Sequence, residues 1–149
     1  MKITMAHGSG GKATSELISN LFAKNFGNPV LLRMEDSAIV PGAEKIAVTT
    51  DSFVVTPLFF KGGDIGRLAV CGTVNDLAVS GAVPKYLTCG FILEEGADTE
   101  ELDRIAASMA ETAKKAGVTI VAGDTKVIEG RGGDQTDTIA DAFRAGQSF

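Results

Sequence analysis

The chain has 149 residues, of which 44% are hydrophobic and 22% are charged, and its net charge is −5 at neutral pH. This length suits one domain of ordinary globular composition. The acidic balance, without a basic stripe, disfavours a nucleic-acid binder. No apolar run approaches the roughly 20 residues that a membrane span needs, so a membrane protein is disfavoured as well.

The first residues also turn polar at once, which argues against a signal peptide. The two cysteines, Cys71 and Cys89, form neither a CxxC pair nor a disulfide framework. We therefore expect a cytoplasmic protein with reduced thiols.

The predicted elements begin after a glycine-rich segment at residues 7–12. A helical pattern over residues 13–26 ends at Gly27. A short strand is predicted at residues 36–40, and a β-branched strand follows at residues 46–56. Asp64 is a suitable cap for a second helix, which runs to Ser80.

The second half of the chain continues this alternation. An apolar strand is predicted at residues 86–93, and Asp98-Thr99-Glu100-Glu101 has the form of a capping box that opens a third helix, which ends at Gly117. A buried-type strand at residues 118–122 runs into Gly123-Asp124. Helices and strands are thus mixed without repeats, which predicts an α/β (α+β) fold.

Four aspartates stand out because they lie in or beside apolar elements: Asp36, Asp51, Asp76 and Asp124. Burying several carboxylates without a cation is costly, and a hard divalent ion such as Mg²⁺, shared with substrate phosphates, would remove that cost. The alternative is that each is a helix cap or a turn residue, which is the more common role of a single aspartate.

The segment His7-Gly8-Ser9-Gly10-Gly11-Lys12 suits anion binding, because glycines let backbone N–H groups approach a phosphate at the start of a helix. It matches neither common phosphate-loop motif, so a mobile N-terminal arm is the alternative. Lys126, two residues after Asp124, could reach a phosphate as a point charge, or could be an ordinary solvated lysine.

Taken in order, eight segments of the sequence resemble one known family. They are His7–Gly11, Glu35–Ala38, Thr49–Phe53, Thr56–Phe60, Gly62–Gly66, Val74–Ala82, Gly90–Gly96 and Gly123–Val127. Together they resemble the hydrogenase-maturation carbamoyl dehydratases, the HypE family, within the superfamily of aminoimidazole ribonucleotide synthetase. The resemblance covers about residues 3–130, which we interpret as the N-terminal, ATP-binding domain.

This resemblance implies a mixed sheet with flanking helices that dimerises into a barrel-like core, with ATP and Mg²⁺ bound at the homodimer interface. The family dehydrates a thiocarboxamide on its own C-terminal cysteine to a thiocyanate, for the cyanide ligands of [NiFe] hydrogenase. The implied partners are the carbamoyltransferase HypF and the HypC–HypD complex.

The resemblance also implies roles for individual residues. The metal ligands are Asp36, Asp51, Asp76 and Asp124, and the catalytic residues are Lys126 and Asp76. The nucleotide-binding residues are His7, Gly8, Ser9, Gly10, Gly11, Thr50, Asp51, Asp64, Asn75 and Asp124.

The sequence departs from the family after Gly130, because residues 130–137 contain no apolar residue. We therefore place a boundary at about residue 130, expect residues 131–149 to be a poorly ordered tail, and expect the final strand of the domain and the C-terminal domain to be missing. On this interpretation the chain alone does not complete the reaction. A non-catalytic dimerising fragment that binds nucleotide, or another superfamily enzyme such as a selenophosphate synthetase or a thiamine-monophosphate kinase, stays open as an alternative.

Overall fold

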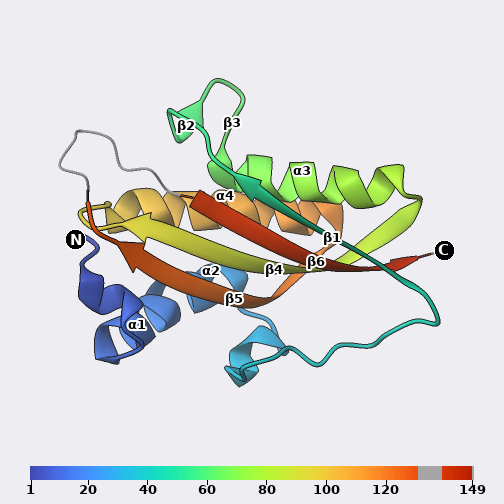
Figure 1. Ribbon diagram of the computed structural model, residues 1–149, viewed down its shortest axis with the longest axis horizontal. Coiled ribbons are helices and arrows are strands. Elements are labelled where there is room, and N and C mark those ends of the chain that lie inside the picture. Colours follow the sequence, from blue (N-terminus) through green and yellow to red (C-terminus); the bar gives the residue numbers. More distant parts are fainter. Residues whose placement is uncertain (131–138, 149) are drawn as a thin grey trace.

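The structure is a computed structural model of the chain, and it describes residues 1–130 and 139–148. Its centre is a four-stranded sheet in the order β1–β6–β4–β5, and a small two-stranded sheet pairs β2 with β3 (Figure 1). The strands are β1 (Ile46–Phe53), β2 (Phe59–Phe60), β3 (Gly63–Asp64), β4 (Ala82–Glu94), β5 (Thr119–Ile128) and β6 (Ile139–Ser148). The helical elements are η1 (Met5–Gly8), α1 (Lys12–Leu17), η2 (Ile18–Phe22), α2 (Ala23–Phe26), η3 (Leu31–Arg33), α3 (Ile65–Val79) and α4 (Thr99–Ala116).

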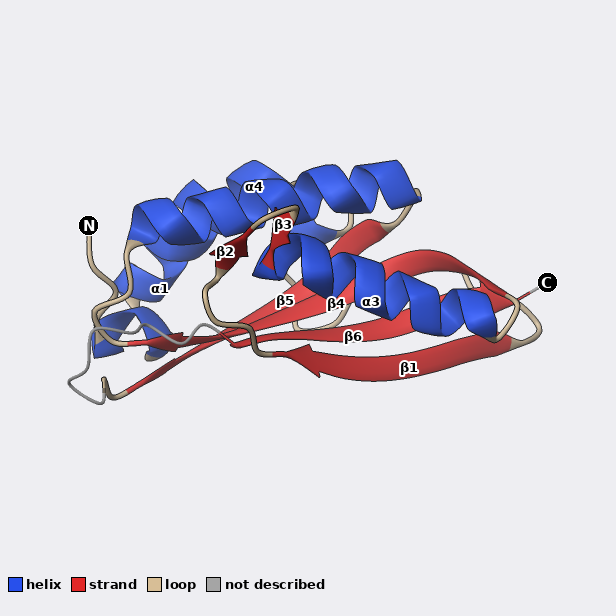
Figure 2. Ribbon diagram, turned by 90° about the horizontal axis from the view of Figure 1, so that it is seen from above, coloured by secondary structure: helices blue, strands red, loops and turns tan. Residues whose placement is uncertain are grey.

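The sheet is mixed, as the resemblance implies. β4 and β5 are parallel and are joined through α4, whereas β6 runs antiparallel to both of its neighbours, β1 and β4. Helices α3 and α4 lie side by side over the sheet, and among the described residues no helix lies on the opposite face of the sheet (Figure 2). β5 and β1 are the two edge strands.

The hydrophobic core lies between the helices and one face of β4. Leu87, Cys89, Phe91 and Leu93 alternate along this strand and are all buried, as a strand with one covered face requires. Cys89 Sγ lies 3.5 Å from the sulfur of Met109 on α4. The ring of Phe91 lies 4.8 Å from that of Phe22 in η2, so the N-terminal helices and α4 cover the same face of β4.

The three predicted helices are confirmed, with one difference in the first. Residues 12–26 form a continuous helical segment, but its middle, Ile18–Phe22, is a π-helix. Asp64 caps α3 as predicted, and Gly117 ends α4 with a φ of 70°. Because this φ is in the left-handed region, glycine is the residue that ends the helix at least cost.

The strand predicted at residues 36–40 is wrong. These residues form neither helix nor strand, although Ile39 and Val40 are β-branched. An isolated β-segment is not stable without a neighbouring strand, and here Asp36 and Ser37 instead line a pocket. The side chain of Ile39 is 70% exposed.

Two further expectations about strands need correction. The strand predicted to stop at residue 122 continues to Ile128, so Asp124 and Lys126 lie within β5 rather than after it. The final strand that was expected to be missing is present, since residues 139–148 form β6 between β1 and β4. The tail prediction for 131–138 and 149 falls outside the described residues.

In residues 1–130 and 139–148, no helix has the length and apolar character that crossing a membrane requires.

An ion pair between α2 and α4 gives a test of the fold. Lys24 Nζ and Asn25 Nδ2 each donate to the Asp103 carboxylate at 2.8 Å, and these bonds, chiefly that from Lys24, hold the pKa of Asp103 below its ordinary value. A depressed pKa means that the stabilisation is present above the unfolded-state pKa and is lost as pH falls through the folded-state pKa.

We expect Asp103→Asn to destabilise the fold at neutral pH by about 1 kcal/mol or less. The difference from the unchanged chain should shrink as the pH falls below about 4. Urea unfolding midpoints across this range measure it. Glu16→Gln, which alters an exposed pair with Lys12 at 3.7 Å, is the control, and a pH-independent difference for Asp103→Asn would contradict the linkage.

Candidate functional site

A pocket of about 340 Å³ lies between the N-terminal helices, the stretch that follows η3, and strands β4 and β5. The residues that line it come from four parts of the chain: Gly8, Gly10, Thr14, Ile18, Phe22, Ala23 and Phe26; Val30, Leu31 and Met34–Ala38; Cys89 and Phe91; and Ile120–Lys126. It therefore brings together segments that are more than a hundred residues apart in the sequence.

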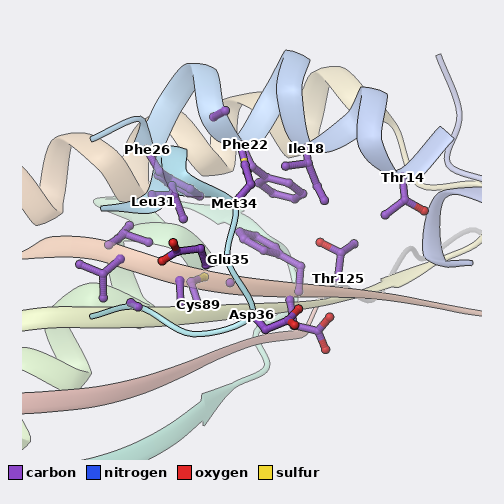
Figure 3. A pocket seen from close by; sticks show the side chains of 18 of the residues that line it. Thr14, Ile18, Phe22, Phe26, Leu31, Met34, Glu35, Asp36, Cys89 and Thr125 are labelled. Carbon is purple, nitrogen blue, oxygen red and sulfur yellow. The ribbon is translucent and has the colours of Figure 1, made fainter. Parts of the chain in front are cut away.

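The pocket has two chemically different ends (Figure 3). Thr14, Asp36 and Thr125 gather toward one end, and Phe26 and Leu31 lie at the other. Gly8, Gly10, Asp124 and Lys126 add to the polar lining, and this set includes five of the predicted site residues, which we call the pocket group: Gly8, Gly10, Asp36, Asp124 and Lys126.

The glycine-rich loop lies directly against β5. A Cβ added at Gly8 would be 2.8 Å from the backbone nitrogen of Val127, which is too close for any other residue without displacement. Gly10 has a φ of 79°, a conformation that favours glycine, and its N–H donates to Thr14 Oγ1 at 3.0 Å. Gly11 is the N-cap residue of α1. Glycines thus allow the loop to touch the strand that carries Asp124 and Lys126.

His7 and Ser9 make their contacts within the loop. His7 is buried, and its Nδ1 accepts the backbone N–H of Thr4 at 3.0 Å. The hydroxyl of Ser9 donates to the carbonyl of Ala6 at 3.0 Å. Neither residue lines the pocket, so both contribute here to the shape of the loop, and a direct contact of either with a nucleotide stays a prediction.

Asp124 and Lys126 form an ion pair on β5, with Lys126 Nζ 2.9 Å from the carboxylate. The hydrogen bond from Lys126 is the largest cause of a lowered pKa at Asp124, which therefore stays ionised. Both residues also line a hollow of about 310 Å³ along β4 and β5, where Gly90 pairs with Asp124. The pair can present either charge to a ligand.

A second set of predicted residues lies elsewhere, on β1 and α3. We call Thr50, Asp51, Asn75 and Asp76 the β1–α3 group. Asp51 lies on the same face of β1 as Phe53, against which Gly72 of α3 packs. Asn75 and Asp76 are exposed on the next turn of α3. Strands β6 and β4 separate this group from β5, so the structure does not bring it to the pocket.

Asp64 belongs to neither group. It accepts hydrogen bonds from the N–H groups of Gly66 at 2.7 Å and Arg67 at 3.1 Å, and from Ser108 Oγ at 2.5 Å. It is buried, and its contacts are those of a helix cap. Its predicted role in nucleotide binding therefore has no support in these contacts, although the second helix that it was predicted to cap is confirmed.

The predicted metal ligands are likewise divided. In the part of the chain that the structure describes, no three histidine, cysteine or acidic side chains lie close enough to hold a metal ion. Asp36 and Asp124 line the pocket, whereas Asp51 and Asp76 lie in the β1–α3 group. A metal site that uses all four carboxylates would need groups that one copy of the chain keeps apart.

Sequence reasoning missed Glu35, Thr125 and the apolar end of the pocket. Glu35 lies in a segment that resembles the family but was given no role. Ile18, Phe22 and Phe26 belong to the helical pattern predicted over residues 13–26, which gave no sign that they also line a cavity against β4 and β5. Helical periodicity alone cannot distinguish a packed face from a pocket wall.

Comparison with known proteins supports one family. Carbamoyl dehydratase HypE of Escherichia coli (strain K12) is 55% identical over 133 residues, which are 85% of this chain and 40% of that protein. A crystal structure of the hydrogenase maturation protein HypE in complex with ATP covers 97% of this chain and 43% of its own, with 48% identity and a TM-score of 0.91. A crystal structure of a HypE–HypF complex covers 87% of this chain and 42% of its own, with 52% identity and a TM-score of 0.61.

The chain thus spans about two fifths of the length of these relatives. The relatives' shared HypE name favours the first interpretation of the sequence over a selenophosphate synthetase or a thiamine-monophosphate kinase. The family model for the N-terminal domain of AIR synthase related proteins matches residues 34–142, which extends beyond the boundary placed at residue 130. We conclude that the chain belongs to the AIR synthase related family.

Proposed function

We propose that this chain is the nucleotide-binding, N-terminal part of a HypE-type carbamoyl dehydratase, which uses ATP and Mg²⁺ to convert a protein-bound thiocarboxamide to a thiocyanate. The observation that carries the proposal is the pocket, which residues of the glycine loop line together with Asp36, Asp124 and Lys126. The relatives' names and the ATP complex of HypE support it.

The residues of the pocket fit a triphosphate and its metal. Gly8 lets the loop pack against Val127, and the open space where a Cβ of Gly10 would stand leaves room for phosphate oxygens. Lys126 supplies a cation, and Asp36 and Asp124 supply the hard oxygen ligands that Mg²⁺ prefers. ATP, when bound, supplies the phosphoryl group that turns an amide oxygen into a leaving group. The chain's own part is to position the phosphates and to balance their charge.

The proposal includes a homodimer. The uncovered face of the sheet carries exposed apolar side chains, namely Ile46 and Val48 on β1 and Ile128 on β5. Pairing this face with that of a second copy would cover them and would form a barrel-like core. It would also allow the β1–α3 group of one copy to approach the pocket group of the other, which completes the set of carboxylates.

The proposed partners and location rest on lesser support. A HypE relative forms a complex with HypF, so we propose the same carbamoyltransferase as a partner here, and the HypC–HypD complex as the acceptor of the product. Cys71 and Cys89 form no disulfide bond with each other, which is in keeping with a reducing, cytoplasmic location.

Calorimetric titration with ATP, with and without Mg²⁺, tests the proposed function. We expect Mg²⁺-dependent binding, and we expect Gly8→Ala to weaken it by about tenfold, because the added methyl group forces the loop off β5 at a cost of about 1–3 kcal/mol. Gly42→Ala is the matched control, since a Cβ there meets nothing within 4 Å.

Two results would count against the proposal in different ways. An unchanged chain that binds no ATP would remove the function itself. Equal affinities for Gly8→Ala and the unchanged chain would leave ATP binding in place but would show that the loop does not hold the phosphates.

A further inference from the structure

Asn28, in the turn between α2 and η3, forms hydrogen bonds with both ends of its side-chain amide. Its Nδ2 donates to the carbonyls of Phe26 at 2.9 Å and of Ile120 at 2.7 Å. Its Oδ1 accepts the backbone N–H groups of Val30 and Leu31, both at 3.1 Å. An amide side chain has two N–H donors and an oxygen with two acceptor positions, so the full hydrogen-bonding capacity of Asn28 is in use.

One of these four bonds reaches a distant part of the chain. Three partners of Asn28 are its neighbours in the sequence, whereas Ile120 is 92 residues away, on β5. β5 is also the strand that carries Asp124. Val30 is the N-cap residue of η3, so the bonds at Oδ1 fix where η3 begins. Asn28 therefore fixes the start of η3 relative to β5.

The stretch that follows η3 has little hydrogen bonding of its own. The N–H of Met34 donates to the carbonyl of Leu31 at 3.1 Å. Within residues 1–130 and 139–148, residues 35–38 belong to no helix or strand and take part in no hydrogen bond or ion pair. All four nevertheless line the pocket, with Asp36 on the side of Thr125 (Figure 3). Their position therefore depends on where η3 ends.

Asn25 makes a comparable link in another direction. Its Nδ2 donates to the carbonyl of Leu21 at 2.9 Å and to the carboxylate of Asp103 on α4 at 2.8 Å. Asn25 and Asn28 are both partly buried, and neither lines the pocket. The two asparagines thus join neighbouring parts of the chain to two different elements, and only Asn28 joins its part to β5.

From this arrangement we propose that Asn28 is a positioning residue for nucleotide binding. By holding the start of η3 on β5, it places Asp36 at the polar end of the pocket, near the strand that carries Asp124. Since Asn28 does not line the pocket, it acts through Asp36 rather than by touching the nucleotide. This inference rests on the proposed function, because it concerns a carboxylate of the same site.

Alanine variants of the two asparagines test the inference. Asn28→Ala and Asn25→Ala each remove hydrogen bonds, so each should lower the melting temperature. We expect calorimetric titration to show ATP binding with Mg²⁺ weakened by about tenfold in Asn28→Ala, since residues that orient metal ligands from behind commonly have effects of this size. The affinity of Asn25→Ala should equal that of the unchanged chain.

Asn28→Asp is a second variant that disturbs the turn less. A carboxylate still accepts the N–H groups of Val30 and Leu31 but cannot donate to Ile120. We expect it to lose affinity as Asn28→Ala does, because the link to β5 is what matters. Circular dichroism confirms that each variant is folded, and Asn28→Asp decides the question if Asn28→Ala does not fold.

A double-mutant cycle with Asp36→Asn tests whether Asn28 acts through Asp36. If it does, Asn28→Asp should weaken ATP binding much less in the Asp36→Asn chain than in the unchanged chain, because the two losses share one cause. Asn25→Ala should have no effect on affinity in either chain.

The outcomes separate this inference from the proposed function. Unchanged affinity in folded Asn28→Asp, an equal loss in Asn25→Ala, or strictly additive losses in the cycle would each overturn the inference and leave the proposed function in place. If the unchanged chain binds no ATP, the proposed function fails and the inference fails with it.

Discussion

Two variants that each bind ATP only weakly are expected to regain tight binding when they are mixed. We expect Asp76→Asn and Asp124→Asn each to weaken Mg²⁺-dependent ATP binding by about a hundredfold or more, since even residues behind metal ligands commonly cost tenfold or more. After subunit exchange, about one quarter of all sites should bind with the affinity of the unchanged chain, if each site takes one group from each copy.

The reason lies in the order of the strands. Asp124 is on β5 and Asp76 lies over β1, at opposite edges of the sheet. Three strand spacings, roughly 14 Å, separate the two edges, so the two carboxylates of one copy cannot bind the same ion. In a mixed dimer, the intact Asp124 of one copy meets the intact Asp76 of the other at one of the two sites.

A matched mixture sets the baseline for this experiment. Asp51 and Asp76 belong to the same β1–α3 group, so mixing Asp51→Asn with Asp76→Asn restores neither site. Light scattering first tests whether the chain is a dimer, and calorimetry then counts the sites. Recovery of binding in neither mixture, although each variant dimerises, would show that the site lies within one copy of the chain.

The largest expected effect on stability comes from Asp64. We expect Asp64→Ala to lower the free energy of unfolding by about 3 kcal/mol, of which about 1 to 2 kcal/mol is the lost helix cap and the rest is the unpaired hydroxyl of Ser108 and the cavity. The melting temperature should fall by about 10 °C. Thermal unfolding followed by circular dichroism measures it.

Two other variants distinguish a helix-capping role of Asp64 from a role in nucleotide binding. Asp98 caps α4 but is less buried and pairs with Lys2, so Asp98→Ala should destabilise the fold less than Asp64→Ala does. Asp64→Asn keeps an acceptor for Gly66 and Arg67 and should retain most of the stability. If Asp64→Asn were as stable as the unchanged chain but had lost nucleotide affinity, the family-derived role of Asp64 would hold after all.

The parts of the fold that the sequence predicted have local causes. Asp64 and Asp98 cap helices through their own side chains, and Gly117 ends one because of its backbone freedom. The strand at residues 46–56 is rich in β-branched residues and forms at Ile46–Phe53. Each of these signals is contained within a few residues, so no knowledge of distant contacts is needed.

The errors concern contacts between distant segments. Residues 36–40 were predicted to form a strand but have no strand to pair with, and Asp36, Ser37 and Ala38 line the pocket instead. Residues 139–148 follow a polar stretch and were interpreted as a tail, yet their place between β1 and β4 depends on backbone pairing with both. The grouping of the candidate site residues could not be predicted for the same reason, because only the fold shows which aspartates lie close together.

The position of β6 affects how the chain can assemble as it is synthesised. β1 has no strand neighbour other than β6 in the described sheet, and about 85 residues separate the two strands in the sequence. The β4–α4–β5 unit can form as soon as it leaves the ribosome, whereas β1 must wait, with its backbone unpaired, until residues 139–148 emerge. A ribosome that pauses before this point holds a nascent chain whose β1 edge is open to aggregation, and a chaperone that acts on this chain would be needed most during that interval.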